Sequence, residues 1–299
     1  MSKKDSNISF IIPAYNCEDT ITETVESVFK GNYQKGDEVI IVNDGSKDGT
    51  KKVLKHLQNQ YHLIKIIDNP RNLGCPASRN VGIGKARNKL IFNLDSDNVL
   101  APKSITVLKE YLLKNKADAA SFGEILFFTK KVNNVTHKWV FNKNNFILPD
   151  LFASHINPGP AGNFLYTKQI WKKVGKYWEY GKGLHEAWGF HLKLLASGAK
   201  YVILPNSYYY HRYGHKSLFV RESKNTNKGI RLTNKMVRPF LSLINIEDVN
   251  YMKKNDWFKN IENHPIRIRF HKIGYKGKKV IVKKTSKDKL TAVINNIFR

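Results

Sequence analysis

The sequence has little cysteine and no long hydrophobic run, and both absences restrict the class of protein. Only two cysteines, Cys17 and Cys75, occur among 299 residues. They are too few for a disulfide framework and fit a reducing compartment. No apolar stretch approaches the roughly 18 residues that a membrane-spanning helix requires. The segment from Met1 to Asn7 does not have the pattern of a signal peptide. We therefore expect a cytoplasmic protein, and leave open contact with the inner face of a membrane.

Acidic residues are also scarce, with 24 Asp and Glu against 51 Lys and Arg. The imbalance is strongest in residues 212–299, which hold 22 Lys and Arg but only 6 Asp and Glu. Such an excess attracts polyanions, among them nucleic acids, anionic lipid headgroups and phosphate-rich polymers. A solvated, lysine-rich surface without any partner explains the same counts equally well. The basic region after residue 220 contains no pattern that indicates catalysis.

Short apolar runs alternate with amphipathic segments in the first third of the chain. The pattern predicts strands at residues 8–12, 37–42, 63–67 and 89–94, and helices at 18–29, 46–58 and 76–85. This alternation is typical of βαβ units and a mainly parallel sheet. The carboxyl ends of parallel strands meet at one edge, where α/β sheets bind ligands. Further on, the polar residues 130–145 fit an insertion or an edge hairpin.

Polar residues follow three of these strands, so we expect them to converge on one crevice. They are Pro13 to Asn16, Asn43 to Ser46, and Asp95 to Asn98. Asp95 and Asp97 lie two positions apart just after a strand, where both carboxylates can approach one cation. Mg²⁺ and Mn²⁺ prefer oxygen ligands and commonly bind few carboxylates together with substrate phosphates. A turn selected only for its backbone hydrogen bonds is the alternative.

Four segments resemble the family 2 glycosyltransferases in order and spacing. They are Ser9 to Asn16, Val42 to Thr50, Asn72 to Gly82, and Leu94 to Asp97. The resemblance implies a glycosyltransferase A type fold, an α/β/α sandwich with a mainly parallel central sheet. The catalytic domain would cover residues 1–220, with a nucleotide-binding half at about 1–100 and an acceptor half at about 101–220. A basic C-terminal extension would follow over residues 221–299.

The same resemblance implies which residues hold the nucleotide. Pro13, Ala14 and Tyr15 would line the base pocket. Asp44 would hydrogen-bond the base, most often uracil in this family, and Arg79 would shape the nucleotide loop. Simpler roles remain open: Tyr15 as a packing aromatic, Asp44 as a turn residue, and Arg79 as a surface cation.

The resemblance also implies a divalent metal cofactor, Mn²⁺ or Mg²⁺. Asp95, with Ser96 beside it, would lie near the ribose and the metal, and Asp97 would be a metal ligand. Either His211 or His215 would come to the metal or the diphosphate, since a neutral imidazole can bind Mn²⁺.

The segment around these histidines, Tyr208 to Ser217, is expected to contribute in two further ways. Arg212 is a candidate phosphate ligand. A mobile loop here would close over the donor and exclude water.

The acceptor side offers one candidate catalytic residue. The family usually has a Glu-Asp pair before a helix, which we expect here at residues 191–197, but this chain reads Glu186-Ala187. Glu186 is therefore the candidate general base for an inverting transfer, and the helix dipole would keep it ionised. A helix-capping role is the alternative. The missing aspartate leaves the inverting outcome open.

These features predict a hexosyltransferase of polysaccharide biosynthesis that moves a sugar from a nucleotide diphosphate donor, a UDP-sugar, to a glycan, polymer or lipid-linked acceptor. Two other classes of protein fit part of the sequence. A nucleic-acid-binding protein would use the basic extension, but an acidic crevice repels phosphate unless a metal intervenes. A nucleotidyltransferase would need a glycine-rich, basic phosphate loop after the first strand, and Pro13 to Glu18 is not one.

Overall fold

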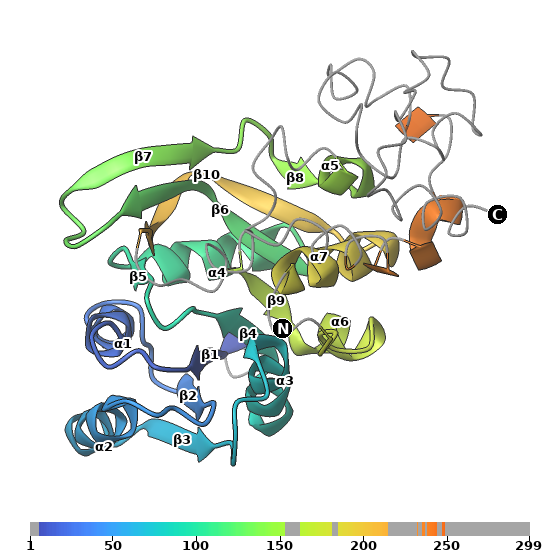
Figure 1. The fold of residues 1–299 in the computed structure, drawn as a ribbon. Helices are drawn as coiled ribbons and strands as arrows, with labels where there is room; N and C mark the ends of the chain where they lie inside the picture. The colour runs from blue at the N-terminus through green and yellow to red at the C-terminus, as the bar shows by residue number, and fades with distance from the viewer. Residues whose placement is uncertain are drawn as a thin grey trace, which may run out of the picture.

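The computed structural model describes residues 6–152, 162–180 and 185–214, with short pieces between 232 and 248. The described residues form one ten-stranded sheet in the order β3-β2-β1-β4-β9-β6-β10-β5, with β7 beside β6 and β8 beside β10 (Figure 1). The strands are β1 (Ile8–Ala14), β2 (Glu38–Asn43), β3 (Ile64–Asp68), β4 (Leu90–Asn93), β5 (Val99–Leu100), β6 (Ala119–Phe128), β7 (Val135–Val140), β8 (Asn145–Phe146), β9 (Leu165–Thr167) and β10 (Tyr201–Arg212).

The first four strands of the chain pair in parallel, as the alternating pattern predicted, but the described sheet as a whole is mixed. Strands β3, β2, β1 and β4 are all parallel, and β10 is parallel to β6. The short strand β9 lies between β4 and β6 and is antiparallel to both. The carboxyl ends of β1, β2 and β4 therefore meet at one edge of the sheet.

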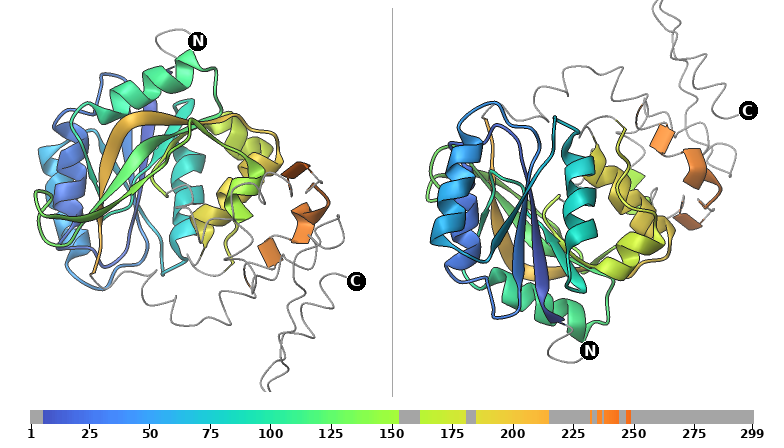
Figure 2. Two further views of the ribbon diagram at one scale, coloured as in Figure 1. Left: turned by 90° about the horizontal axis from the view of Figure 1, so that it is seen from above. Right: turned by 90° about the horizontal axis from the view of Figure 1, so that it is seen from below.

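Helices cover both faces of this sheet, which makes an α/β/α sandwich (Figure 2). One buried cluster packs the sheet against α1 (Ile21–Phe29), α2 (Thr50–Gln60) and α4 (Ser104–Lys114). The other packs it against α3 (Cys75–Lys85), α5 (Leu148–Phe152), α6 (Lys168–Lys173) and α7 (Glu186–Ala196). A short 3₁₀ helix, η2 (Arg238–Leu243), lies further along the chain.

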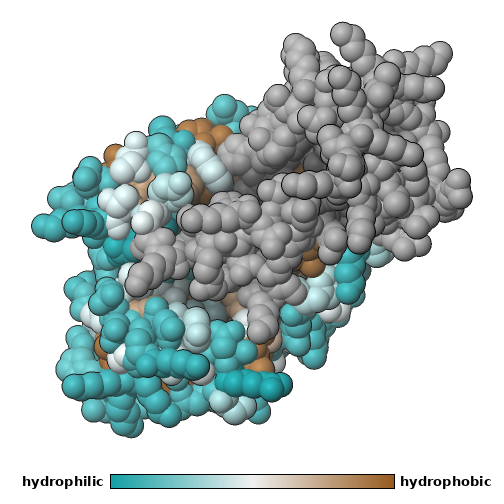
Figure 3. Space-filling view, in the orientation of Figure 1, coloured by the Kyte–Doolittle hydropathy of each residue, from teal (hydrophilic) through white to brown (hydrophobic). Residues whose placement is uncertain are grey.

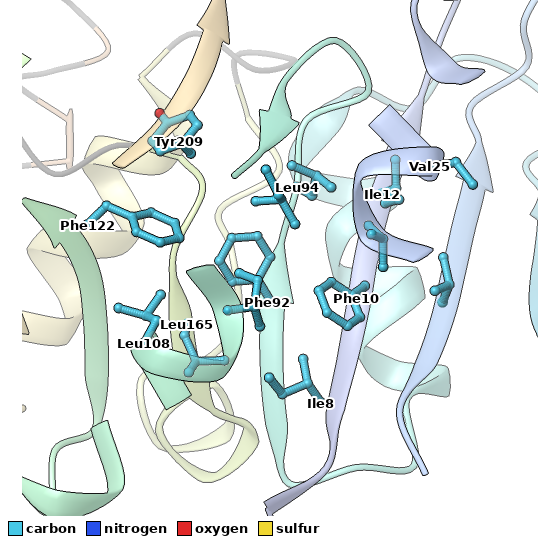
Figure 4. Packing of buried hydrophobic residues seen from close by; sticks show 14 of the residues in the cluster. Ile8, Phe10, Ile12, Val25, Phe92, Leu94, Leu108, Phe122, Leu165 and Tyr209 are labelled. Atoms are coloured by element: carbon cyan, nitrogen blue, oxygen red, sulfur yellow. The ribbon is translucent and has the colours of Figure 1, made fainter. Parts of the chain in front are cut away.

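Successive side chains of β1 point to opposite faces of the sheet, so this one strand contributes to both buried clusters. Phe10 and Ile12 belong to the cluster under α1, whereas Ile11 belongs to the cluster under α3. The ring of Phe10 lies 5.9 Å from that of Phe92, which lies 6.3 Å from that of Phe122, so aromatic rings cross the sheet from β1 through β4 to β6 (Figure 4). Full burial of each such side chain stabilises the fold by roughly 1.5–3 kcal/mol.

Two expected boundaries differ from the structure. Helix α7 begins at Glu186 rather than at His191. Strand β10 continues from Tyr201 to Arg212, so Tyr208 to Arg212 lie in a strand and not in a mobile loop. The reason is strand pairing: this end of β10 is hydrogen-bonded to β6 on one side and to β5 on the other.

The edge hairpin that the sequence suggested for residues 130–145 is confirmed, because β7 pairs antiparallel with β6.

Several sequence predictions lie outside the described residues. They include His215 and most of residues 221–299. Among the described helices, none is long and apolar enough to cross a bilayer. The described surface in Figure 3 is mainly hydrophilic, with small separate hydrophobic areas.

Candidate active site

The turns after β1, β2 and β4 lie side by side, as the sequence predicted. The backbone N–H of Asp44 donates to the carbonyl of Ala14 at 2.8 Å, and that of Leu94 donates to Ile11 at 3.0 Å. The Thr20 hydroxyl, just before α1, donates to the carbonyl of Ser96 at 2.9 Å. These bonds gather the three polar segments at one edge of the sheet.

The residues expected at the base pocket differ in exposure. Pro13 and Ala14 are buried in β1, while Tyr15 is 40% exposed and is therefore not a core packing residue. Asp44 is buried, and its carboxylate accepts three hydrogen bonds: from Asn69 Nδ2 at 2.8 Å, from the Leu73 N–H at 3.0 Å and from the Gly74 N–H at 2.8 Å. Asp44 thus anchors the loop that leads into α3, and its contact with a base stays a prediction.

Arg79 is the centre of a buried ionic cluster, and not a surface cation. Its side chain is 1% exposed, and its Nη2 donates to Asp95 Oδ1 while its Nη1 donates to Glu186 Oε2. The ring of Tyr177 lies 5.5 Å from the guanidinium carbon. The pairing with two carboxylates compensates much of the cost of burying the charges of Arg79 and Glu186. The sequence placed these residues in separate roles, whereas the structure brings them together.

Burial governs the titration of this cluster. It raises the pKa of Glu186, and the Arg79 guanidinium opposes that rise. It also raises the pKa of the Cys75 thiol, whose Sγ lies 4.0 Å from Glu186 Oε1. Cys75 therefore stays protonated and unreactive near neutral pH. Gly162 completes the packing, because a Cβ there would lie 3.3 Å from Arg79 Nη2 and 3.4 Å from Asp95 Oδ2.

Two asparagines that the sequence analysis missed orient the acidic turn. Asn163 accepts the N–H of Asp95 at 2.7 Å, and its Nδ2 lies 3.3 Å from Asp95 Oδ2. Asn98, fully buried, also reaches Asp95 Oδ2 at 3.3 Å and accepts the N–H of Arg212 at 3.0 Å. Asn98 is the last residue of the polar run Asp95-Ser96-Asp97-Asn98, so its place at the site could have been predicted from the sequence. No local pattern marks Asn163.

Arg212 is engaged inside the protein. Its guanidinium donates to the carbonyls of Asp97 and Thr129 at 3.1 and 3.0 Å, and it pairs with Glu23. The side chain is 9% exposed and stacks 4.5 Å from the ring centre of Phe128. The expectation that Arg212 holds phosphate therefore needs correction, because its donors already fix the acidic turn to α1 and β6.

His211 lies close to the same turn. Its Nδ1 is 3.3 Å from Nδ2 of Asn98. The Oδ1 of Asn98 accepts a hydrogen bond from the Arg212 N–H, which fixes the orientation of the amide. Since that amide nitrogen is a donor, Nδ1 accepts and Nε2 carries the proton. A metal bond through Nε2 would require the opposite tautomer, so His211 as a ligand stays a prediction.

The donor set suits a hard cation with few protein ligands. Asp95 and Asp97 supply carboxylate oxygens on a partly exposed turn. In the described part of the chain, no three His, Cys, Asp or Glu side chains gather closely enough to hold a metal by themselves.

Comparison with known proteins gives one family match. The model for "Glycosyl transferase family 2" matches residues 9–175. An "Uncharacterized glycosyltransferase" of Haemophilus influenzae is 37% identical over 108 residues, which are 36% of this chain and 33% of that protein. The "Poly(ribitol-phosphate) beta-glucosyltransferase" of Bacillus spizizenii is 32% identical over 113 residues, which are 37% of this chain and 18% of that protein. The chain thus spans a third or less of the length of these two relatives.

Solved structures agree on the fold. The structure of Staphylococcus aureus TarS 1-349 in complex with UDP-GlcNAc superimposes with a TM-score of 0.60 at 20% identity. The match covers 77% of this chain and 66% of that one. At this identity the likeness shows the architecture, which is the α/β/α sandwich described above.

Proposed function

Because the chain belongs to glycosyl transferase family 2, we propose that it transfers a hexose from a UDP-sugar to a glycan, polymer or lipid-linked acceptor. The observation that carries this proposal is the acidic turn Asp95 to Asp97, held beside the ends of β1 and β2. Exposed Tyr15 at the same edge offers a ring to a nucleotide base. The complex of TarS with UDP-GlcNAc supports a donor of this kind.

The donor site would use a divalent cation, Mn²⁺ or Mg²⁺, which Asp97 and Asp95 would hold. When bound, such a cation neutralises the diphosphate and stabilises it as a leaving group. The protein's own contribution is to fix the turn. Asn98, Asn163 and Arg212 hold its backbone and one carboxylate, so the turn need not reorganise when the donor binds.

The acceptor is proposed to be anionic. A relative that is named for poly(ribitol-phosphate) supports this class, as does the excess of 22 Lys and Arg over 6 Asp and Glu in residues 212–299. A phosphate polymer or a lipid-linked glycan at a membrane surface fits this charge. Nucleic acid is not favoured, because an acidic crevice repels phosphate unless a metal intervenes.

For Glu186 the geometry supports a positioning role over that of general base. Its Oε2 accepts from Arg79, and its side chain is 11% exposed. A base must reach the acceptor hydroxyl with a free lone pair, and Glu186 would first have to leave a buried guanidinium. We propose that Glu186 holds Arg79 so that Arg79 can hold Asp95. The acceptor proton then goes to another group.

UDP is expected to stabilise the protein in the presence of Mn²⁺, and much less when EDTA is added. Ligand at about 100 times its dissociation constant adds roughly 2.7 kcal/mol to the free energy of unfolding. Thermal unfolding with UDP, ADP, CDP and GDP measures the effect and its base preference. If no nucleoside diphosphate raises the melting temperature with metal present, the proposed donor site is wrong.

Glu186→Gln is expected to lower the free energy of unfolding by about 1–3 kcal/mol, because Arg79 loses a charged partner. UDP affinity and turnover should fall together, since the Arg79–Asp95 pair is disturbed. Calorimetric UDP binding and sugar transfer, measured on the same preparation, check this. The control is Glu110→Gln, at an exposed position of α4.

The opposite pattern would restore the role that the sequence suggested for Glu186. A fall in turnover of about 10²–10⁴-fold with unchanged UDP affinity and unchanged stability would identify it as the general base.

A further inference from the structure

Three exposed aromatic side chains surround Phe127 at the far end of the sheet. Trp139 and Tyr213 are 43% and 47% exposed, and His137 is exposed as well, while Phe127 beneath them is 5% exposed. The ring of Phe127 lies 4.3 Å from His137, 4.8 Å from Trp139 and 6.3 Å from Tyr213. We call His137, Trp139 and Tyr213 the aromatic platform. Exposed aromatic side chains that gather in one place often mark a binding surface.

Strand register explains why these rings share one face. His137 of β7 is opposite Phe127 of β6, and Trp139 is opposite Ile125. On the other side of β6, His211 of β10 is also opposite Phe127. Directly opposed residues project to the same face of a sheet.

This part of the sheet face is open to solvent. All six residues of β7 are exposed, and the strand lies at the outer edge of the described fold (Figure 1). Helix α4 packs against β6 through the buried cluster that contains Leu108 and Phe122. That helix leaves the rings on β7 uncovered.

Contacts between side chains link the platform to the proposed donor site. The ring of His211 lies 5.1 Å from that of Phe127. Its Nδ1 lies 3.3 Å from Asn98 Nδ2, which also lies 3.3 Å from Asp95 Oδ2. Asn98, His211 and Phe127 therefore lie between the acidic turn and the platform. A molecule that receives a sugar at the turn has to extend over a neighbouring surface, and this one is adjacent.

The chemistry of the rings suits carbohydrate. Each exposed ring has apolar faces and carries a polar group at its edge: the indole N–H of Trp139, the hydroxyl of Tyr213 or a ring nitrogen of His137. One face of His137 stacks on Phe127, and the ring of Tyr213 is perpendicular to that of His137. Pyranose rings have the matching arrangement, with C–H groups on a face and hydroxyls around the rim. Three strands about 4.8 Å apart give a surface wider than one sugar ring.

We propose that the aromatic platform is an acceptor subsite that holds pyranose rings of the acceptor chain by stacking. This inference rests on the proposed glycosyltransferase function and names a surface for its acceptor. Trp139 supplies the largest ring, Tyr213 adds a second exposed ring, and Phe127 contacts both from below.

The test compares Trp139→Ala with Trp139→Phe and with Val140→Ala. Val140 is 38% exposed and lies next to Trp139 in β7, but points to the opposite face. The full chain, with UDP and Mn²⁺, is applied to immobilised hexasaccharides: cellohexaose, chitohexaose, maltohexaose and the anionic hexasaccharide of hyaluronan. UDP-induced thermal stabilisation is measured on each variant in parallel, and so is oligomeric state.

The parent protein should bind at least one hexasaccharide, and Trp139→Ala should lose about tenfold in affinity, the worth of one stacked aromatic ring. Trp139→Phe should recover most of that loss, and Val140→Ala should bind like the parent. Binding only to the hyaluronan fragment would assign the subsite to anionic acceptors, and binding only to the neutral chains would assign it to uncharged ones.

Either of two results would overturn the subsite: no hexasaccharide bound by the parent, or equal binding by Trp139→Ala. A shift to monomer in Trp139→Ala, without loss of sugar binding, would instead make this face a contact between copies of the chain. Failure of the glycosyltransferase proposal is seen separately, as absence of UDP stabilisation in the parent.

Discussion

Replacement of Arg79 by methionine is expected to lower the free energy of unfolding by about 3–5 kcal/mol, the usual cost of removing one member of a buried ionic group. Methionine keeps an apolar stem of similar length, so packing against Tyr177 changes little. What is lost is the cation between Asp95 and Glu186, whose carboxylates then face each other without compensation. Urea unfolding measures the change.

The pH dependence separates this electrostatic cost from a packing defect. Without Arg79, burial and Asp95 both raise the pKa of Glu186 further. A raised folded-state pKa favours the fold when the group is protonated, and that benefit is lost as pH rises through the pKa. The deficit of the variant should therefore be smaller at about pH 5 than at about pH 8.

Arg87→Met is the matched control. Arg87 is 67% exposed, with its Nε 3.7 Å from Glu38 Oε2. Exposed ion pairs contribute at most about 1 kcal/mol, so this variant should stay within that range at both pH values. Equal deficits in the two variants would contradict the view that Arg79 organises the site.

Asp97→Asn is expected to reduce metal-dependent sugar transfer on the order of 100-fold or more, because a cation that stabilises developing charge contributes several kcal/mol. The fold should persist, since the turn is held by Asn98, Asn163 and Arg212 through backbone and Asp95 contacts. Transfer or donor hydrolysis over a Mn²⁺ series, with the unfolding midpoint as a check, measures the effect.

Asp19→Asn provides the same chemical change at an exposed position near α1. Its transfer rate should match that of the parent at every Mn²⁺ concentration. Unchanged transfer by Asp97→Asn at limiting Mn²⁺ would show that Asp97 is not a ligand. A lowered unfolding midpoint would show instead that its carboxylate supports the turn.

The nucleotide-binding half was predictable from sequence because its signals are local. Apolar alternation in Ile8–Ala14 and helical spacing in Ile21–Phe29 each define one element. Their order then fixes a parallel sheet and the edge at which the polar turns meet. Asp95 and Asp97 come directly after β4 at that edge, so the sequence pattern identifies them as candidate site residues.

The later part of the chain was less predictable because its contacts are long-range. Tyr208 to Arg212 were expected in a mobile loop, yet pairing with β6 and β5 places them in strand β10. In this position Arg212 bonds to the carbonyls of Asp97 and Thr129 and to Glu23, so it stabilises the acidic turn and is not a phosphate ligand. Glu186 looked like a base because no local signal revealed Arg79, which is 107 positions away in the chain.

The sequence by itself determined the family, the α/β alternation and the position of the acidic turn, since each depends on residues close together in the chain. Only the tertiary structure decided which charges pair. Arg79, Asp95 and Glu186 come from α3, the turn after β4 and the start of α7, and they meet because those elements pack on the same side of the sheet. The aromatic platform is likewise a product of strand register, which sets His137 and His211 on either side of Phe127. Pairing of this kind depends on how the elements dock, and local sequence does not encode it.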